Sequence, residues 1–191
     1  MSPDRSIKGT SLAVTLELVR ERFGDEGVLA VQTRMPPKER AELPDDMRPL
    51  PSSTYAFEVW AELLLAIDAV YGQPKSLVRE SSRIGYSKLL RSTYRNWVHP
   101  DDVRATLRRL PLLFEQVTRG IGTLEYVERD GRILILGHYD VCQRYRAIVV
   151  ERVAGTIEAA IEVAGGHGRV DVRGLPDVAE YAISLEGAGA G

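Results

Sequence analysis

The densest cluster of reactive side chains lies where a short apolar segment meets a long amphipathic one. It contains His138, Tyr139, Asp140 and Cys142. A cysteine nucleophile needs a general base within hydrogen-bonding reach of its thiol, and His138 is the base that this cluster offers. The alternative is a small buried thiol at a strand-to-helix junction. Spacing along the chain alone does not show that His138 reaches the thiol, and we favour the structural interpretation over a Cys142-dependent enzyme.

Arginines give the sequence a second candidate site. Arg79, Arg83, Arg91 and Arg95 share the polar side of one predicted helix, and residues 72–119 carry ten Lys/Arg against four Asp/Glu, although the whole chain has a net charge of −2. Such a segment can bind an anionic ligand or an acidic protein partner, or it can be a solvated face paired with the acidic remainder. The negative net charge and the lack of a helix-turn-helix or RNA-binding motif argue against nucleic acid.

The elements that must position these residues are helical in the first half of the chain. After a short strand at 7–10, apolar residues at helical spacing predict helices over 11–24, 26–33, 38–42, 54–71, 74–97 and 102–119, the last interrupted by Pro111. The helix over 54–71 carries few charged residues, so we expect it to be buried on most sides.

The periodicity changes from helical to alternating after residue 119. Asp130-Gly131 lies between alternating apolar residues, which is the strongest short signal for a β-hairpin. A long amphipathic helix follows from Val141 to Gly165-Gly166, where Gly165-Gly166-His167-Gly168 acts as a helix stop. A second hairpin is expected over 169–172 and 178–185.

This order predicts an α+β fold. The helical N-terminal half is followed by hairpin, long helix and hairpin, which form a small antiparallel sheet packed on helices. We expect a flexible N-terminus over 1–10, a single ligand-binding or adaptor-like domain over 11–186 and a flexible tail over 187–191.

Apolar stripes on two of the helices face the expected junction between the helical half and the sheet. They predict a ligand pocket lined by Phe57, Trp60, Leu64, Tyr145, Val149 and Val153. The same residues would equally build a solid core. Small residues on another face of the long helix, Ala154 and Gly155 among them, permit close approach of a second backbone, so that face is either a dimer contact or exposed.

Composition limits the classes of protein that remain. Charged residues make up 27% and hydrophobic residues 44% of the 191 residues, as in ordinary globular domains. The single cysteine excludes an internal disulfide and a multi-cysteine zinc site, which favours a reducing, cytoplasmic setting. The N-terminus lacks the apolar core of a signal peptide, and no apolar stretch is long enough for a transmembrane segment.

Three stretches carry a resemblance to known proteins: Ile7-Lys8-Gly9-Thr10 with ERFG near the start, LPSSTY before the buried helix, and VVERVAGTIEAAIEVAGG near the end. With this order of elements, the chain resembles the NO-signalling and Golgi-transport ligand-binding fold. That fold includes haem-NO-binding sensors, vinyl-4-reductase-type domains and Bet3-like subunits of vesicle-tethering complexes. The chain is most similar to an uncharacterised myxobacterial family of about 200-residue proteins.

The resemblance implies cofactor and modification sites that can be compared with this sequence. Bet3-like proteins imply acylation of a buried cysteine, for which Cys142 is the candidate. Haem sensors imply a helical histidine and a Tyr-x-Ser-x-Arg motif, which neither Tyr86-Ser87-Lys88 nor Ser92-Thr93-Tyr94-Arg95 reproduces. Because Pro100 follows His99, this histidine is expected at a helix end instead of inside a helix. We therefore expect neither a cofactor nor a metal.

Together these observations predict a non-catalytic cytoplasmic signalling or adaptor domain of bacterial type. It would bind a small apolar ligand or a protein partner at the junction. The alternatives are a homodimeric interaction subunit without a ligand and, less favoured, the enzyme that uses Cys142.

Overall fold

The computed structural model describes residues 5–71, 74–174 and 177–186 of the chain. The helices are α1 (Gly9–Arg34), α2 (Pro37–Arg40), α3 (Phe57–Tyr71), α4 (Pro74–Arg91), the 3-10 helix η1 (Arg95–Trp97), α5 (Val103–Arg108), α6 (Leu110–Val117) and α7 (Gln143–Val163). The strands are β1 (Ser6–Lys8), β2 (Thr54–Ala56), β3 (Thr118–Arg119), β4 (Gly122–Arg129), β5 (Arg132–Tyr139), β6 (Gly168–Gly174) and β7 (Ala179–Leu185).

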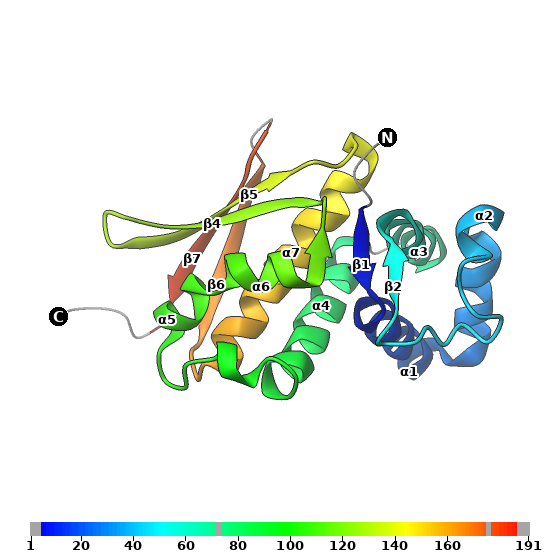
Figure 1. Ribbon diagram of the computed structural model, residues 1–191, viewed down its shortest axis with the longest axis horizontal. Coiled ribbons are helices and arrows are strands. Elements are labelled where there is room, and N and C mark those ends of the chain that lie inside the picture. Colours follow the sequence, from blue (N-terminus) through cyan, green and yellow to red (C-terminus); the bar gives the residue numbers. More distant parts are fainter. Residues whose placement is uncertain (1–4, 72–73, 175–176, 187–191) are drawn as a thin grey trace.

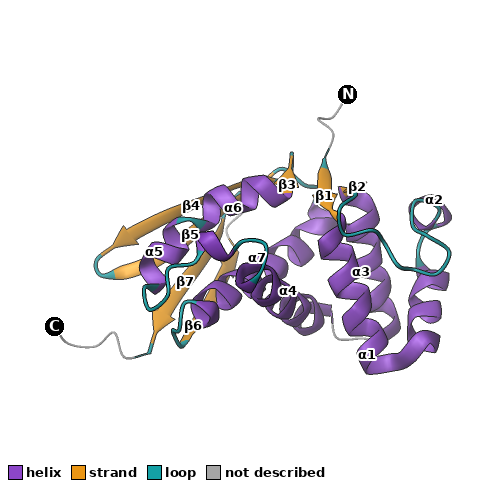
Figure 2. Ribbon diagram, turned by 60° about the horizontal axis from the view of Figure 1, so that its bottom comes forward, coloured by secondary structure: helices purple, strands orange, loops and turns teal. Residues whose placement is uncertain are grey.

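The predicted α+β architecture is confirmed. A four-stranded antiparallel sheet, in the order β4-β5-β7-β6, forms one side of the molecule. Helices α7 and α4 lie next to it, and α1 and α3 lie beyond them (Figures 1 and 2). Alternate residues of β5 and β7, such as Ile135 and Tyr181, are buried on one face of the sheet, which is the alternation expected when one face covers a core.

The hairpin of β4 and β5 forms where its turn residues predict. Asp130 and Gly131 both have positive φ angles, 51° and 73°, as a two-residue type I′ turn requires. The strands pair in register from Gly122 with Tyr139 to Arg129 with Arg132. The second hairpin and the long helix α7 between the two hairpins also agree with the prediction.

Several boundaries in the helical half differ from the prediction. The two helices expected over 11–24 and 26–33 form one kinked element, α1, in which Gly24 alone has non-helical angles (φ 69°, ψ −172°). This positive φ suits glycine, and the helix resumes after the kink at this residue. The helix expected over 74–97 ends at Arg91, and η1 follows it.

A second, three-stranded sheet in the order β2-β1-β3 was not predicted as a unit. Ser6 pairs with Ala56 and with Arg119, so this small sheet ties together three distant parts of the chain. Residues 54–56, expected to begin a helix, form β2, and α3 starts at Phe57. Ordered structure also begins before the boundary expected at residue 11, because β1 starts at Ser6; residues 187–191 lie outside the described residues.

Helices α4 and α7 approach each other closely through small residues. A Cβ atom on Gly155 of α7 would lie 2.1 Å from the carbonyl oxygen of Arg79 on α4. Ala154 and Gly155 are both buried, so the face of α7 that was expected to be a dimer contact or exposed packs inside the same chain. This close packing sets the position of the buried side chains that α7 presents to α1 and α3.

Candidate ligand-binding site

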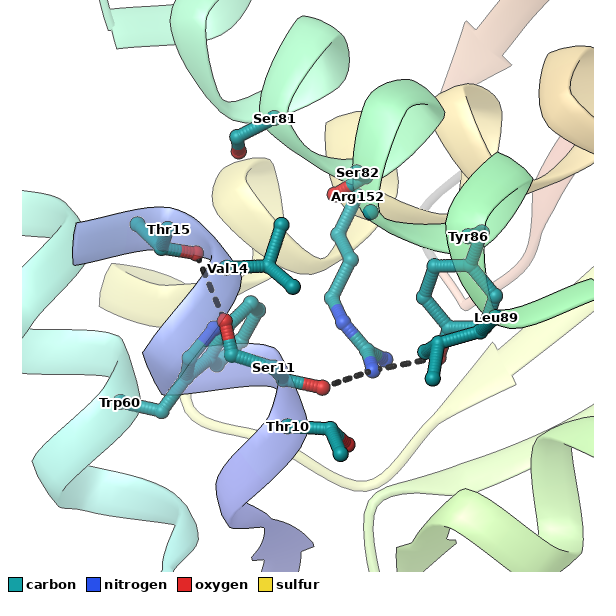
Figure 3. Close-up of a pocket in the computed structure, with 11 residues that line it drawn as sticks. Thr10, Ser11, Val14, Thr15, Trp60, Ser81, Ser82, Tyr86, Leu89 and Arg152 are labelled. Carbon is teal, nitrogen blue, oxygen red and sulfur yellow. Dashed lines mark hydrogen bonds between the residues drawn. The ribbon is translucent and has the colours of Figure 1, made fainter. Parts of the chain in front are cut away.

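A small cavity lies where α1, α3, α4 and α7 meet (Figure 3). Its volume is about 20 Å³. It is lined mainly by hydroxyl groups, one indole and one guanidinium: Thr10, Ser11, Val14, Thr15, Trp60, Ser81, Ser82, Gly85, Tyr86, Leu89 and Arg152. A cavity needs roughly 10–15 Å³ to hold one water molecule, so this one admits a single oxygen-sized group.

Arg152 of α7 supplies the only formal charge in the lining. Its side chain is 3% exposed. Its Nη2 donates hydrogen bonds to the Tyr86 hydroxyl at 2.6 Å and to Ser11 Oγ at 3.2 Å, and its guanidinium lies over the Trp60 ring, 5.0 Å from the centroid. Figure 3 shows the guanidinium held between Ser11 and Tyr86. Arginine stays protonated in proteins, so this is a buried positive charge.

The charge of Arg152 lacks a counterion among the described residues. No carboxylate oxygen of the described chain lies within 4.0 Å of its nitrogens, whereas Arg79 on the neighbouring helix pairs with both Glu151 and Glu158. Tyr86 does not provide a negative charge, because burial raises the pKa of its hydroxyl and the guanidinium offsets only part of that rise. A buried charge bound only to neutral groups is energetically costly, and an anion in the cavity would offset that cost.

A larger groove adjoins the cavity on its outer side. The two share Thr10, Val14 and Leu89, and the groove has a volume of about 380 Å³. Further groove residues come from α1, the loop before β2 and the end of α4: Ala13, Glu17, Arg20, Met47, Arg48, Pro49, Pro51, Lys88 and Ser92.

The loop that forms the outer wall of the groove is anchored at several points. Arg20 Nη2 donates to the Asp46 carbonyl oxygen at 3.4 Å, and the Leu50 backbone N–H donates to the Tyr55 hydroxyl at 3.1 Å. Met47 has a φ angle of 54° and a buried side chain. The groove therefore has a wall fixed in place by α1 and β2.

The six residues predicted to line an apolar pocket lie together, and most are in the core. Phe57, Leu64, Val149 and Val153 are buried. The Phe57 ring lies 5.7 Å from the rings of both Trp60 and Tyr145. Trp60 is the one of the six that also lines the cavity beside Arg152. A ligand pocket lined by the other five residues stays a prediction.

Glu62 of α3 lies beside this aromatic cluster and forms hydrogen bonds with residues of α7. Its carboxylate accepts hydrogen bonds from Arg144 Nη2 at 2.8 Å and from the Tyr145 hydroxyl at 2.7 Å. Burial, followed by this hydrogen bond, raises the pKa of the Tyr145 hydroxyl. Glu62 thus fastens α3 to the start of α7 and is fully engaged within the chain.

The residues present do not fit a haem group. Iron needs an axial ligand such as histidine facing an open apolar space. His99 is half-buried in the loop before α5, where its backbone N–H donates to Thr106 Oγ1 at 2.8 Å, and His138 and His167 are exposed. None of these histidines lines either the cavity or the groove, and the aromatic junction is filled by side chains in contact.

The cluster around Cys142 is more exposed than the sequence predicted. Cys142 occupies the N-cap position of α7, as expected for a strand-to-helix junction, but it is exposed, so the prediction of a buried thiol is wrong. His138 is also exposed, whereas Tyr139 is buried and its hydroxyl lies 2.6 Å from that of Tyr181. Acylation or reactivity of Cys142 stays a prediction.

The four selected arginines have different surroundings. Arg79 is half-buried and has its carboxylate partners on α7, while Arg83 and Arg91 both pair with Glu162, at 3.1 Å and 3.6 Å. Arg95 is exposed. Carboxylates of α7 therefore already accompany three of the four charges, in agreement with the solvated-face alternative, while an acidic partner stays a prediction.

Sequence reasoning missed Arg152, although a signal was present. Arg152 lies between Val149 and Val153 on the apolar side of α7, where Ile148 and Thr156 precede and follow it at helical spacing. A lone arginine on an otherwise apolar, buried face of a helix is rare unless its charge is paired with another group. Its partners Ser11 and Tyr86 come from other helices and could not be assigned from spacing.

Comparison with known proteins supports the fold. No protein-family model and no curated protein matches this chain. Among solved structures, an Fe(II) unliganded H-NOX protein from K. algicida matches with a TM-score of 0.74 at 15% identity, over 94% of this chain and 97% of that one. An oxygen-binding H-NOX domain related to soluble guanylate cyclases matches with a TM-score of 0.64 at 12% identity, over 94% of this chain and 95% of that one.

Two further findings concern the described residues as a whole. No helix among them is both long and apolar enough to cross a bilayer. They also contain no group of three or more histidine, cysteine, aspartate or glutamate residues placed to hold a metal ion. The chain thus has the fold of H-NOX domains, and its described residues place a lone buried arginine where four helices meet.

Proposed function

We propose that this protein is a non-catalytic binding module that recognises a carboxylate-bearing small molecule at Arg152. The observation that carries the proposal is the buried guanidinium, which faces a cavity and has only neutral hydrogen-bond partners. A signalling or adaptor role in the cytoplasm, and kinship with the uncharacterised myxobacterial family, remain part of this proposal. The likeness to H-NOX domains supports a sensor role by analogy of fold.

The size and polarity of the cavity favour a carboxylate over larger anions. A space of about 20 Å³ admits one oxygen atom, and a planar carboxylate that places one oxygen there brings less bulk to the entrance than tetrahedral sulfate or phosphate would. Ser11 and Tyr86 surround the guanidinium with hydroxyls that can donate to that oxygen. A charge-assisted bond to arginine is about twice as strong as a neutral one, which suits recognition of a single group.

The proposal revises the ligand class expected from sequence. The apolar stripes predicted a small apolar ligand or a protein partner, whereas the cavity next to Trp60 contains the guanidinium of Arg152. Homodimerisation, a protein partner and Cys142 chemistry are separate predictions.

The proposal is tested by titrating sodium acetate into the protein while following Trp60 fluorescence in a Trp97→Phe background. The chain has two tryptophans, so this background isolates the indole that lies under Arg152. We expect saturable binding in roughly the millimolar range, because so small a ligand makes few contacts. Sodium sulfate at equal ionic strength should give no saturable change.

Two variants separate a specific site from a general salt effect. Arg152→Met should weaken acetate binding by about tenfold or more, because a hydrogen bond to a charged group is worth roughly 1.5–3 kcal/mol. Arg83→Met removes an exposed arginine of α4 and should leave binding unchanged. Thermal stabilisation by acetate provides a readout independent of Trp60. Equal responses of wild type and Arg152→Met to acetate would refute the proposal.

A further inference from the structure

We infer that the carboxylate reaches Arg152 at the end of an apolar chain, so that the ligand is an amphipathic monocarboxylic acid whose chain lies in the adjoining groove. This inference rests on the proposed function and adds the class of ligand to it. It comes from the groove, a feature separate from the hydrogen bonds of Arg152 itself.

The first step is that cavity and groove adjoin each other. Thr10, Val14 and Leu89 line both spaces, and Figure 3 shows these residues beside the Arg152 guanidinium. A group bound at Arg152 therefore leads outward between α1 and α4 into the groove. Since the cavity holds only an oxygen-sized group, the rest of any ligand must lie on the groove side.

The second step is that the groove has an apolar lining and a volume large enough for a small molecule. Its volume of about 380 Å³ falls within the roughly 300–1,000 Å³ typical of small-molecule sites. Its apolar residues are Ala13, Val14, Met47, Pro49, Pro51 and Leu89. Hydrogen bonds of Arg20 with the Asp46 carbonyl oxygen and of the Leu50 N–H with the Tyr55 hydroxyl hold the wall that carries Met47 and Pro49. The apolar lining is therefore largely in place before a ligand binds.

The third step is that charges at the groove are mostly satisfied within the chain. Lys88 pairs with Glu17 at 3.3 Å, and Arg20 pairs with Asp25 at 2.8 Å. Arg48 is exposed at the outer edge. Arg152 has no carboxylate partner among the described residues, whereas Lys88 and Arg20 in the groove each have one. This distribution of charge fits a ligand with one acidic end and an apolar body.

The test compares linear carboxylates of increasing length, from acetate through butyrate and hexanoate to octanoate, by calorimetry on the whole protein. We expect affinity to rise by about threefold for each added methylene, close to the gain for burying that group. Hexan-1-ol, which has the chain without the charge, should bind at least about tenfold more weakly than hexanoate.

A matched pair of variants tests whether the apolar chain of the ligand lies in the groove. Ser92 is exposed and lines the groove, while its neighbour Thr93 is exposed and does not line it. Ser92→Phe should abolish most of the gain in affinity from acetate to octanoate, because the added ring occupies the groove. Thr93→Phe should retain the full gain with chain length.

The outcomes distinguish the two proposals. If acetate and octanoate bind with equal affinity, the inference that the ligand's apolar chain lies in the groove is wrong and the Arg152 site stands. The same conclusion follows if Ser92→Phe and Thr93→Phe retain the same gain in affinity with chain length. If no carboxylate binds, or if hexan-1-ol matches hexanoate, the Arg152 site itself is wrong.

Discussion

The central residue of this protein is Arg152, a buried arginine with no carboxylate partner among the residues that the structure describes. Arg152 and Arg79 face different surroundings although they belong to packed neighbouring helices. The guanidinium of Arg79 donates to Glu158 at 2.5 Å and to the Val170 carbonyl oxygen at 2.7 Å. The hydrogen bonds of the Arg152 guanidinium to described residues go to the hydroxyls of Ser11 and Tyr86. Sites built for ligands commonly sacrifice stability in this way.

This contrast predicts opposite effects of the same substitution on stability. Arg152→Met should change the free energy of unfolding by less than about 1 kcal/mol or raise it, because an apolar side chain of similar length removes an uncompensated charge. Arg79→Met should lower it by about 1–2 kcal/mol, because Glu158 and the Val170 carbonyl lose a partner and Arg79 is only partly exposed. Urea unfolding monitored by circular dichroism measures both values.

A large loss of stability in Arg152→Met, equal to or above that of Arg79→Met, would show that the guanidinium is a structural element. In that case the cavity would need no ligand to explain it. Unchanged denaturant slopes in both variants serve as the control, since they indicate that the unfolding transition remains comparable.

At the scale of elements, the packing of α4 on α7 determines where Arg152 and Tyr86 meet. Gly155 allows this packing, because its Cα faces the Arg79 carbonyl oxygen directly. Gly155→Ala should therefore destabilise the protein by about 1–3 kcal/mol through overpacking. Gly174→Ala is the matched control: a Cβ there meets no atom within 4 Å, so its effect should be close to zero.

Thermal unfolding of the two alanine variants, with acetate binding as a second readout, checks the role of the helix contact. If Gly155→Ala is as stable as wild type, the α4–α7 contact tolerates a shift and does not fix the site.

The elements that could be predicted are those with local signals. Asp130-Gly131 specifies a turn by its own φ preferences, and the 3.6-residue period of α7 is visible over its length. Strands β2 and β3 could not be predicted from sequence. They are only three and two residues long, and their partner Ser6 lies far from Ala56 and Arg119 along the chain. The kink at Gly24 was predicted as a helix end, because a glycine signals a break locally and does not show that α1 continues beyond it.

At the scale of the whole molecule, the fold resembles H-NOX domains, yet its centre holds packed rings and an arginine. The stripes of α3 and α7 were predictable from sequence, but a stripe does not tell whether the space between helices is filled. The rings of Phe57, Trp60 and Tyr145 pack against one another here, and one small cavity lies beside Arg152.

The measurement that tests this account most directly is a ¹³C NMR titration of carboxyl-labelled octanoate with wild-type protein and Arg152→Met. A guanidinium beside the bound carboxylate favours its ionised form, so the bound signal should appear at a distinct shift and resist protonation as the pH falls. We predict this signal for wild type and its loss in Arg152→Met. The same bound signal with the same pH dependence in both proteins would contradict the account, because octanoate would then bind without contacting Arg152.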